Sequence, residues 1–124
     1  MILASRLILL SAIVFAIVGL AYLVVPAAML AVVGITSDAQ SDFLMRTEGV
    51  ALASAAVFLW AARSGSVAQL RIVLVGLGLY YILGSLVDLA AFADGIVGPA
   101  SVPSAIVRIA LGGVGLVVAA RLRS

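Results

Sequence analysis

The chain has 124 residues, of which 66% are hydrophobic and 10% are charged, and its formal net charge is +2. A soluble domain averages about 45–50% apolar and about 25% charged residues, and a chain this short cannot bury so much apolar surface in water. The composition therefore predicts one integral membrane domain over residues 1–124, without a separate soluble module.

The sequence contains neither cysteine nor histidine. The first absence excludes disulfides and thiolate chemistry, and the second removes the commonest metal ligand and general base. All seven basic residues are arginines, and they are too scattered to indicate nucleic-acid binding. We therefore expect a non-enzymatic protein without a cofactor, a bound metal or a nucleic-acid partner.

Four apolar stretches are long enough to cross a bilayer, which takes about 20 residues in a helix. Their apolar residues form continuous runs rather than alternating with polar ones, which favours helices over barrel strands. The first run is longer than the roughly 7–15 residues of a cleavable signal, so we expect it to be retained. In chain order the predicted spans are residues 7–25, 43–62, 72–93 and 102–120.

A short apolar segment, residues 26–35, follows the first span and begins with Pro26. It is too short to cross the bilayer, and proline is well tolerated in the first turn of a helix, so we expect a short helix at the membrane interface. The connections 36–42, 63–69 and 94–101 carry polar residues, glycine or proline. The predicted fold is an all-α membrane protein, a bundle of four transmembrane helices with a short interfacial helix after the first span.

Arginine distribution predicts the orientation, because basic residues favour cytoplasmic loops. If four helices alternate, one side of the membrane receives Arg6, Arg63, Arg71, Arg121 and Arg123. The opposite side receives three aspartates, with Arg46 as the nearest basic residue. We therefore expect both termini in the cytoplasm and a multi-pass protein of a bacterial inner membrane.

Four charged residues lie in or at the edge of the predicted spans: Arg46, Glu48, Asp88 and Arg108. Counted from the span ends at about 1.5 Å per residue, three of them lie roughly 7–9 Å below the outer boundary, with Arg46 just above. Charges at the bilayer centre cost about 2.5–3.5 kcal/mol and usually pair inside a bundle. We predict that these residues form an interhelical polar cluster. The cluster either fastens the helices together or binds a ligand or ion. In the remaining alternative, an arginine side chain only extends to the membrane interface.

One face of the third span carries a second candidate feature. Gly76, Tyr80, Gly84 and Asp88 recur every four residues and so share a helix face, with Tyr81 and Ser85 beside it. Such a face indicates either a polar groove or ordinary close packing of small residues. The candidate groove residues are Tyr80, Tyr81, Gly84 and Ser85.

Several short motifs occur in a recognisable order. Pro26 follows the first span, Arg46-Thr47-Glu48-Gly49 opens the second and Ala61-Ala62-Arg63 closes it. Gly84-Ser85 and Asp94-Gly95 mark the third, and Pro99 or Pro103 precedes the fourth. In this order the chain resembles an uncharacterised bacterial membrane family, the domain-of-unknown-function 4345 group. The resemblance implies a four-span fold and no established activity. Ser85 stands where that pattern has arginine, and Arg108 where it has an acid.

Three functions fit the sequence. The first is a non-enzymatic accessory subunit, scaffold or lipid-binding component that packs in the bilayer against a larger membrane protein or a second copy. The second is a small oligomeric transporter or channel that uses Glu48 or Asp88. The third is an intramembrane lipid- or quinone-binding protein, in which Arg108 would suit an anionic head group. We prefer the first, because the chain lacks the common catalytic side chains.

Overall fold

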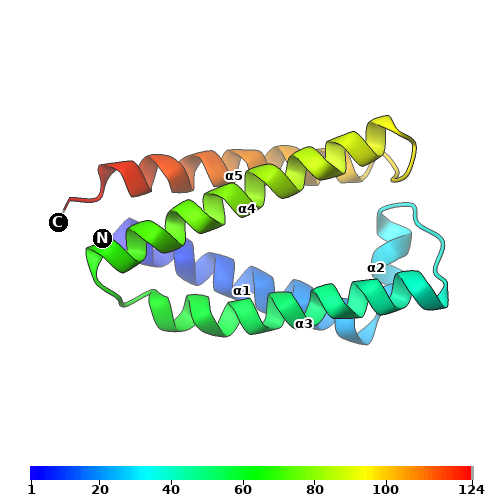
Figure 1. Ribbon diagram of the computed structural model, residues 1–124, viewed down its shortest axis with the longest axis horizontal. Helices are drawn as coiled ribbons and strands as arrows, with labels where there is room; N and C mark the ends of the chain where they lie inside the picture. Colours follow the sequence, from blue (N-terminus) through cyan, green and yellow to red (C-terminus); the bar gives the residue numbers. More distant parts are fainter. Residues whose placement is uncertain (124) are drawn as a thin grey trace.

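The computed structural model describes residues 1–123, which form five α-helices and no strand (Figure 1). The helices are α1 (Ile2–Val24), α2 (Pro26–Val32), α3 (Ala39–Ala62), α4 (Val67–Ala93) and α5 (Ser101–Arg121). The four long helices are each long and apolar enough to cross a membrane, and the short α2 follows the first of them. The predicted fold class, an all-α bundle with a short helix after the first span, is confirmed.

Capping residues extend α3 and α4 beyond their apolar parts. Asp38 accepts a hydrogen bond from the Ser41 backbone N–H (2.7 Å), and Ser41 Oγ accepts one from the Asp38 N–H (2.9 Å). Ser66 and Gln69 form the same reciprocal pattern before α4. These capping boxes provide partners for the backbone N–H groups that have none in the first turn of a helix. Each of the two helices therefore begins several residues before its predicted span. The hydrogen bond from the Ser41 N–H also holds the pKa of Asp38 below its usual value, because it stabilises the charged form of the cap.

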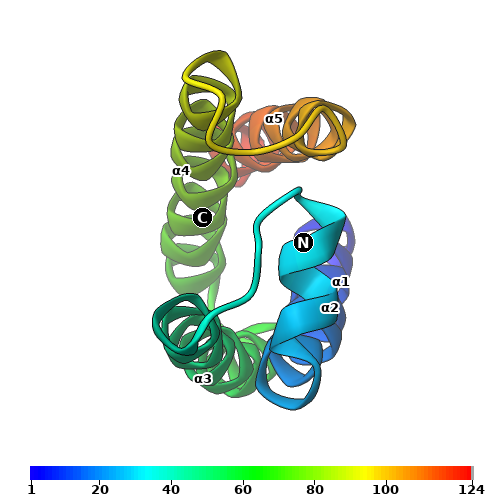
Figure 2. The ribbon, with the colours of Figure 1, turned by 90° about the vertical axis from the view of Figure 1, so that its right-hand side faces the viewer.

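The four long helices form two closely packed pairs, α1 with α3 and α4 with α5, and contacts between the pairs are sparse (Figures 1 and 2). Glycines bring the backbones together in both pairs. A Cβ atom at Gly49 would lie 2.7 Å from the Gly19 carbonyl oxygen, and one at Gly112 would lie 2.8 Å from the Gly78 carbonyl oxygen. Only glycine permits these two backbone approaches.

Buried apolar side chains from all four long helices meet in the half of the bundle nearer the chain ends. We call this end, which holds both termini and the connection from α3 to α4, the terminal end (Figure 1). Its core includes Ile8, Leu59, Leu70, Leu74 and Ala119. Ile8 and Leu70 are fully buried. The two helix pairs are therefore held together mainly by apolar packing at this end.

The opposite end, which we call the α2 end, holds α2 and the connection from α4 to α5 (Figure 2). Here the Gly98 N–H donates a 2.7 Å hydrogen bond to the Val33 carbonyl oxygen. Gly34 has a positive φ of 77°, and a Cβ atom there would lie 3.1 Å from the Gly98 nitrogen. A backbone contact thus links α2, and with it the first helix pair, to the second pair.

The outside of the bundle is apolar. Large side chains such as Ile17, Val57, Phe58, Ile72 and Val87 are more than half exposed on the long helices. A surface of this kind is unfavourable in water and is typical of helices that face lipid. Together with the length of the four helices, it is the expected surface of a small multi-pass membrane protein.

Candidate polar site between the helix pairs

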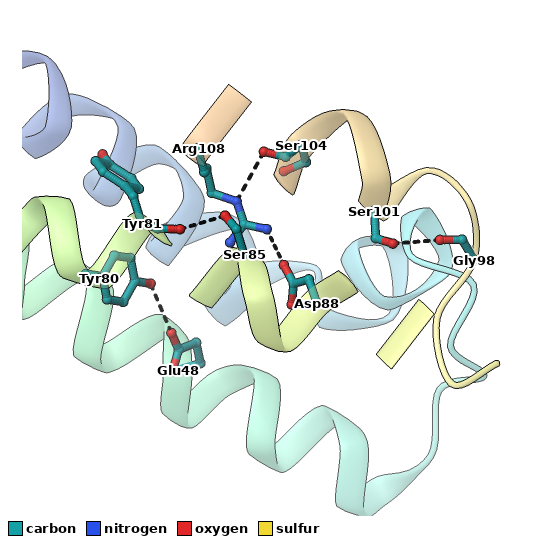
Figure 3. Close-up of polar contacts among 9 residues, drawn as sticks. All are labelled: Glu48, Tyr80, Tyr81, Ser85, Asp88, Gly98, Ser101, Ser104 and Arg108. Carbon is teal, nitrogen blue, oxygen red and sulfur yellow. Dashed lines mark hydrogen bonds and ion pairs between the residues drawn. The ribbon is translucent and has the colours of Figure 1, made fainter. Parts of the chain in front are cut away.

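The interior faces of α4 and α5 change from apolar to charged toward the α2 end. On α4, Asp88 lies one turn beyond the buried Ser85. On α5, Arg108 lies one turn from the buried Ala105. The Arg108 guanidinium forms an ion pair with Asp88 that joins the two helices (Figure 3). The pair joins two of the four charged residues that the sequence analysis assigned to an interhelical cluster.

The surroundings of Arg108 position its side chain toward Asp88. Its Nε donates a long hydrogen bond of 3.4 Å to the Ser104 carbonyl oxygen (Figure 3). A Cβ atom at Gly84 would lie 3.8 Å from Arg108 Nη1, at ordinary van der Waals distance, so Gly84 lies beside the guanidinium. The side chains of Arg108 and Asp88 remain 27% and 40% exposed. The ion pair of Arg108 and Asp88 therefore carries no net charge, and both side chains remain partly exposed.

Glu48 reaches the same level from α3. It lies one turn beyond Leu52, a buried core residue, and therefore on the interior side of its helix. The Tyr80 hydroxyl donates a long hydrogen bond of 3.5 Å to Glu48 Oε1 (Figure 3). This contact connects α4 to α3 and so crosses from one helix pair to the other. We call Glu48, Tyr80, Asp88 and Arg108 the polar layer.

Below the polar layer, polar and aromatic groups connect α4 to α1. The Tyr81 hydroxyl donates a 2.9 Å hydrogen bond to Ser11 Oγ, and both residues are buried. The Phe15 ring lies 5.2 Å from the Tyr80 ring and 6.0 Å from the Tyr81 ring, between ring centroids. Ser85 Oγ donates to the Tyr81 carbonyl oxygen at 2.6 Å within α4.

The four candidate groove residues therefore divide into two kinds. Tyr81 and Ser85 are buried and their hydroxyls are used in packing. Tyr80 is 43% exposed and Gly84 lies beside Arg108, so these two face the polar layer. Only this second pair remains available to a ligand.

Arg46 lies apart from the other three charged residues. It is exposed, and within residues 1–123 the one ion pair is that of Arg108 and Asp88. Residues two positions apart in a helix point in different directions, so Arg46 and Glu48 do not share a face. Of the four predicted cluster residues, Asp88 and Arg108 contact each other and Glu48 contacts Tyr80, whereas Arg46 has no ion pair within residues 1–123.

Two neighbours of the site were not foreseen. A Cβ atom at Gly49 would lie 3.0 Å from Tyr22 Cβ, so Tyr22 packs beside the residue that follows Glu48. Tyr22 is also within electrostatic range of Glu48, Asp88 and Arg108. Ser11, the partner of Tyr81, is the one serine or threonine in the predicted span 7–25. That isolation is a usable signal, because a buried hydroxyl needs a partner, but it does not reveal which one.

No family model, curated protein or solved structure matches the chain. The family resemblance drawn from the sequence stays a prediction, and the site is interpreted from its geometry. Residues 1–123 contain no group of three His, Cys, Asp or Glu side chains that could hold a metal ion. The polar layer offers charged side chains, hydrogen-bonding groups and an aromatic ring, and these can bind the polar group of a ligand.

Proposed function

We propose that this protein is a non-enzymatic membrane component that binds a lipid-like amphiphile between its two helix pairs, with the polar head of the ligand at the polar layer. One observation carries the proposal. The interior is tightly packed at the terminal end, whereas Tyr80, Asp88 and Arg108 remain partly exposed on the interior side toward the α2 end. Polar groups in a membrane span are costly, so an accessible set of them on the interior side favours a ligand.

Retention of a ligand during gentle extraction tests this function. We expect native mass spectrometry of the protein to show one amphiphile retained per chain. The variant Gly84→Leu should lose it, because the new side chain grows toward Arg108 and fills the polar layer. The matched control is Gly76→Leu on the same face of α4, where an added Cβ meets nothing within 4 Å. A wild-type protein without any amphiphile, or equal retention by both variants, would contradict the proposal.

Assembly with another chain is a second candidate, and a surface groove favours it. Small residues of α1 and α3 line an open apolar groove of about 400 Å³ together with Trp60. They include Ala12, Ala16, Ala53 and Ala56. Small residues allow a further helix to approach closely, from a second copy or from a larger membrane protein. The same mass measurement distinguishes this role, because it would reveal a second polypeptide in place of a retained amphiphile.

A transporter is supported less well by the geometry. Of the two acids predicted within the spans, Asp88 is paired with Arg108, and Glu48 has no ion pair within residues 1–123. Transport sites usually lie near the bilayer midplane. Glu48 belongs instead to the α2 half of α3, above the apolar core.

The proposed location is a bacterial inner membrane, with both termini in the cytoplasm. Five arginines support this orientation, since they occur in or beside the segments at the terminal end: Arg6, Arg63, Arg71, Arg121 and Arg123. Two of them are anchored there. The Arg63 guanidinium lies 3.6 Å from the centroid of the Trp60 ring, and that of Arg71 donates to the Leu122 carbonyl oxygen.

The cysteine-free chain allows a direct test of this orientation. Thr36 and Ser64 are exposed in connections at opposite ends of the bundle. In intact spheroplasts, a membrane-impermeant maleimide should label Thr36→Cys and leave Ser64→Cys unlabelled until the membrane is permeabilised. Labelling of Ser64→Cys alone would show the reverse orientation.

A further inference from the structure

We infer that the ligand head is a cation, an ammonium group held by Glu48 beside the Tyr80 ring. This inference rests on the proposed function and names the ligand class of the same site. It begins with the charges of the polar layer. The ion pair of Asp88 with Arg108 is neutral, and Arg46 follows another side of α3. Glu48 therefore leaves one uncompensated negative charge between the helix pairs.

Glu48 has little stabilisation from the protein. Its carboxylate accepts one hydrogen bond, the 3.5 Å contact from the Tyr80 hydroxyl, among the side-chain contacts of residues 1–123. The nearest hydroxyl on its own helix, that of Thr47, donates to the Phe43 carbonyl oxygen instead. Glu48 is exposed on the bundle, and an exposed carboxylate within a membrane span still needs a charged or hydrogen-bonding partner. An ammonium group supplies both.

Tyr80 brings an aromatic ring to this carboxylate, and two further rings pack against that of Tyr80. The Tyr80 ring, whose hydroxyl touches Glu48, lies 5.2 Å from the Phe15 ring and 5.9 Å from the Tyr81 ring. On α1, Tyr22 packs beside Gly49, the residue that follows Glu48. Ring faces attract cations within about 6 Å, most strongly where water is excluded. Phe15 and Tyr81 are buried and support the Tyr80 ring, which is 43% exposed. An unpaired carboxylate beside an accessible aromatic ring is an arrangement that favours ammonium ions with apolar substituents.

The same arrangement excludes two other ligand classes. An anionic head, which Arg108 alone would suit, would meet an arginine already neutralised by Asp88 and a free carboxylate opposite. A divalent metal ion needs several oxygen or nitrogen ligands, and residues 1–123 offer no group of three such side chains. The apolar surroundings favour a ligand with a hydrocarbon chain behind its cationic head.

Calorimetric titration of the protein in a neutral detergent tests this inference. The probes are dodecyltrimethylammonium and dodecyl phosphate, which share one chain and differ in the charge of the head. We expect saturable binding of the ammonium probe and weaker binding of the phosphate. Glu48→Gln should weaken ammonium binding by about tenfold or more, the scale of one charge-assisted contact. The matched control Asp42→Asn removes an acid of the same helix outside the polar layer, and it should bind as the wild type does.

Two further variants test the aromatic contribution and guard against misfolding. Tyr80→Phe keeps the ring and should retain most of the ammonium affinity, whereas Tyr80→Leu should reduce it severalfold, with a cooperative melting transition confirming that the variant is folded. Tighter binding of the phosphate, or equal ammonium binding by Glu48→Gln, would overturn the cation assignment and leave the proposed function standing. Absence of saturable binding for both probes would overturn the proposed function as well.

Discussion

Replacing Gly112 with alanine is expected to lower the thermal unfolding temperature of the protein in detergent, whereas the same change at the adjacent Gly113 is not. A Cβ atom at position 112 would lie 2.8 Å from the Gly78 carbonyl oxygen and 2.8 Å from Ile82 Cγ1. Such overpacking costs typically about 1–3 kcal/mol. A Cβ atom at position 113 meets nothing within 4 Å, and alanine is the better helix former by about 0.8–1 kcal/mol.

A second pair of glycines on the facing helix provides the control. Alanine at Gly78 would place its Cβ atom 2.7 Å from Leu116 Cγ and 3.0 Å from the Gly112 carbonyl oxygen. Alanine at Gly76 meets open space. Gly78→Ala should therefore destabilise the protein and Gly76→Ala should not. Equal melting temperatures for all four variants would show that α4 and α5 do not approach each other as described.

Replacing Asp88 with asparagine is expected to destabilise the protein by about 1–3 kcal/mol, because it leaves Arg108 without its counter-charge. Breaking a fully buried pair would cost about 3–5 kcal/mol. The smaller value follows from the partial exposure of both side chains, which lets surrounding water or lipid head groups screen the remaining charge. Chemical denaturation of the variant in detergent measures the difference.

A double-mutant cycle isolates the contribution of this pair. Arg108→Gln should destabilise the protein on its own, and adding it to Asp88→Asn should cost less than the sum of the two single changes. Purely additive effects would mean that the two residues do not interact. In that case the polar layer would contain separate charges rather than a neutral pair.

Much of the fold follows from the sequence, because length and hydropathy alone determine which segments can cross a bilayer. The four spans and the short helix at Pro26 were predicted in this way. Their N-terminal limits were less well predicted, since the apolar stretch of α3 begins after the helix does. Asp38 and Ser66 determine where α3 and α4 begin, through hydrogen bonds that hydropathy does not register.

The pairing of helices was not predictable, because four apolar segments with small residues on several faces allow many arrangements. Gly112 and Gly113 are equivalent in the sequence, and only the rotation of α5 about its axis decides which one touches α4. The same rotation determines the partners of the charges. Topology placed Arg46 and Glu48 in one layer, but their two-residue spacing sends Glu48 toward Tyr80 and Arg46 away from it.

The close pairing of neighbouring spans has a consequence for biogenesis. Each tight pair consists of helices that follow one another along the chain, apart from the short α2 between α1 and α3. Contacts that are local in sequence form quickly, and domains tend to fold in order during synthesis. We therefore expect α1 and α3 to associate soon after α3 enters the bilayer, before the ribosome has completed α5. The polar layer, whose members come from three helices, can be assembled only when the last span has inserted.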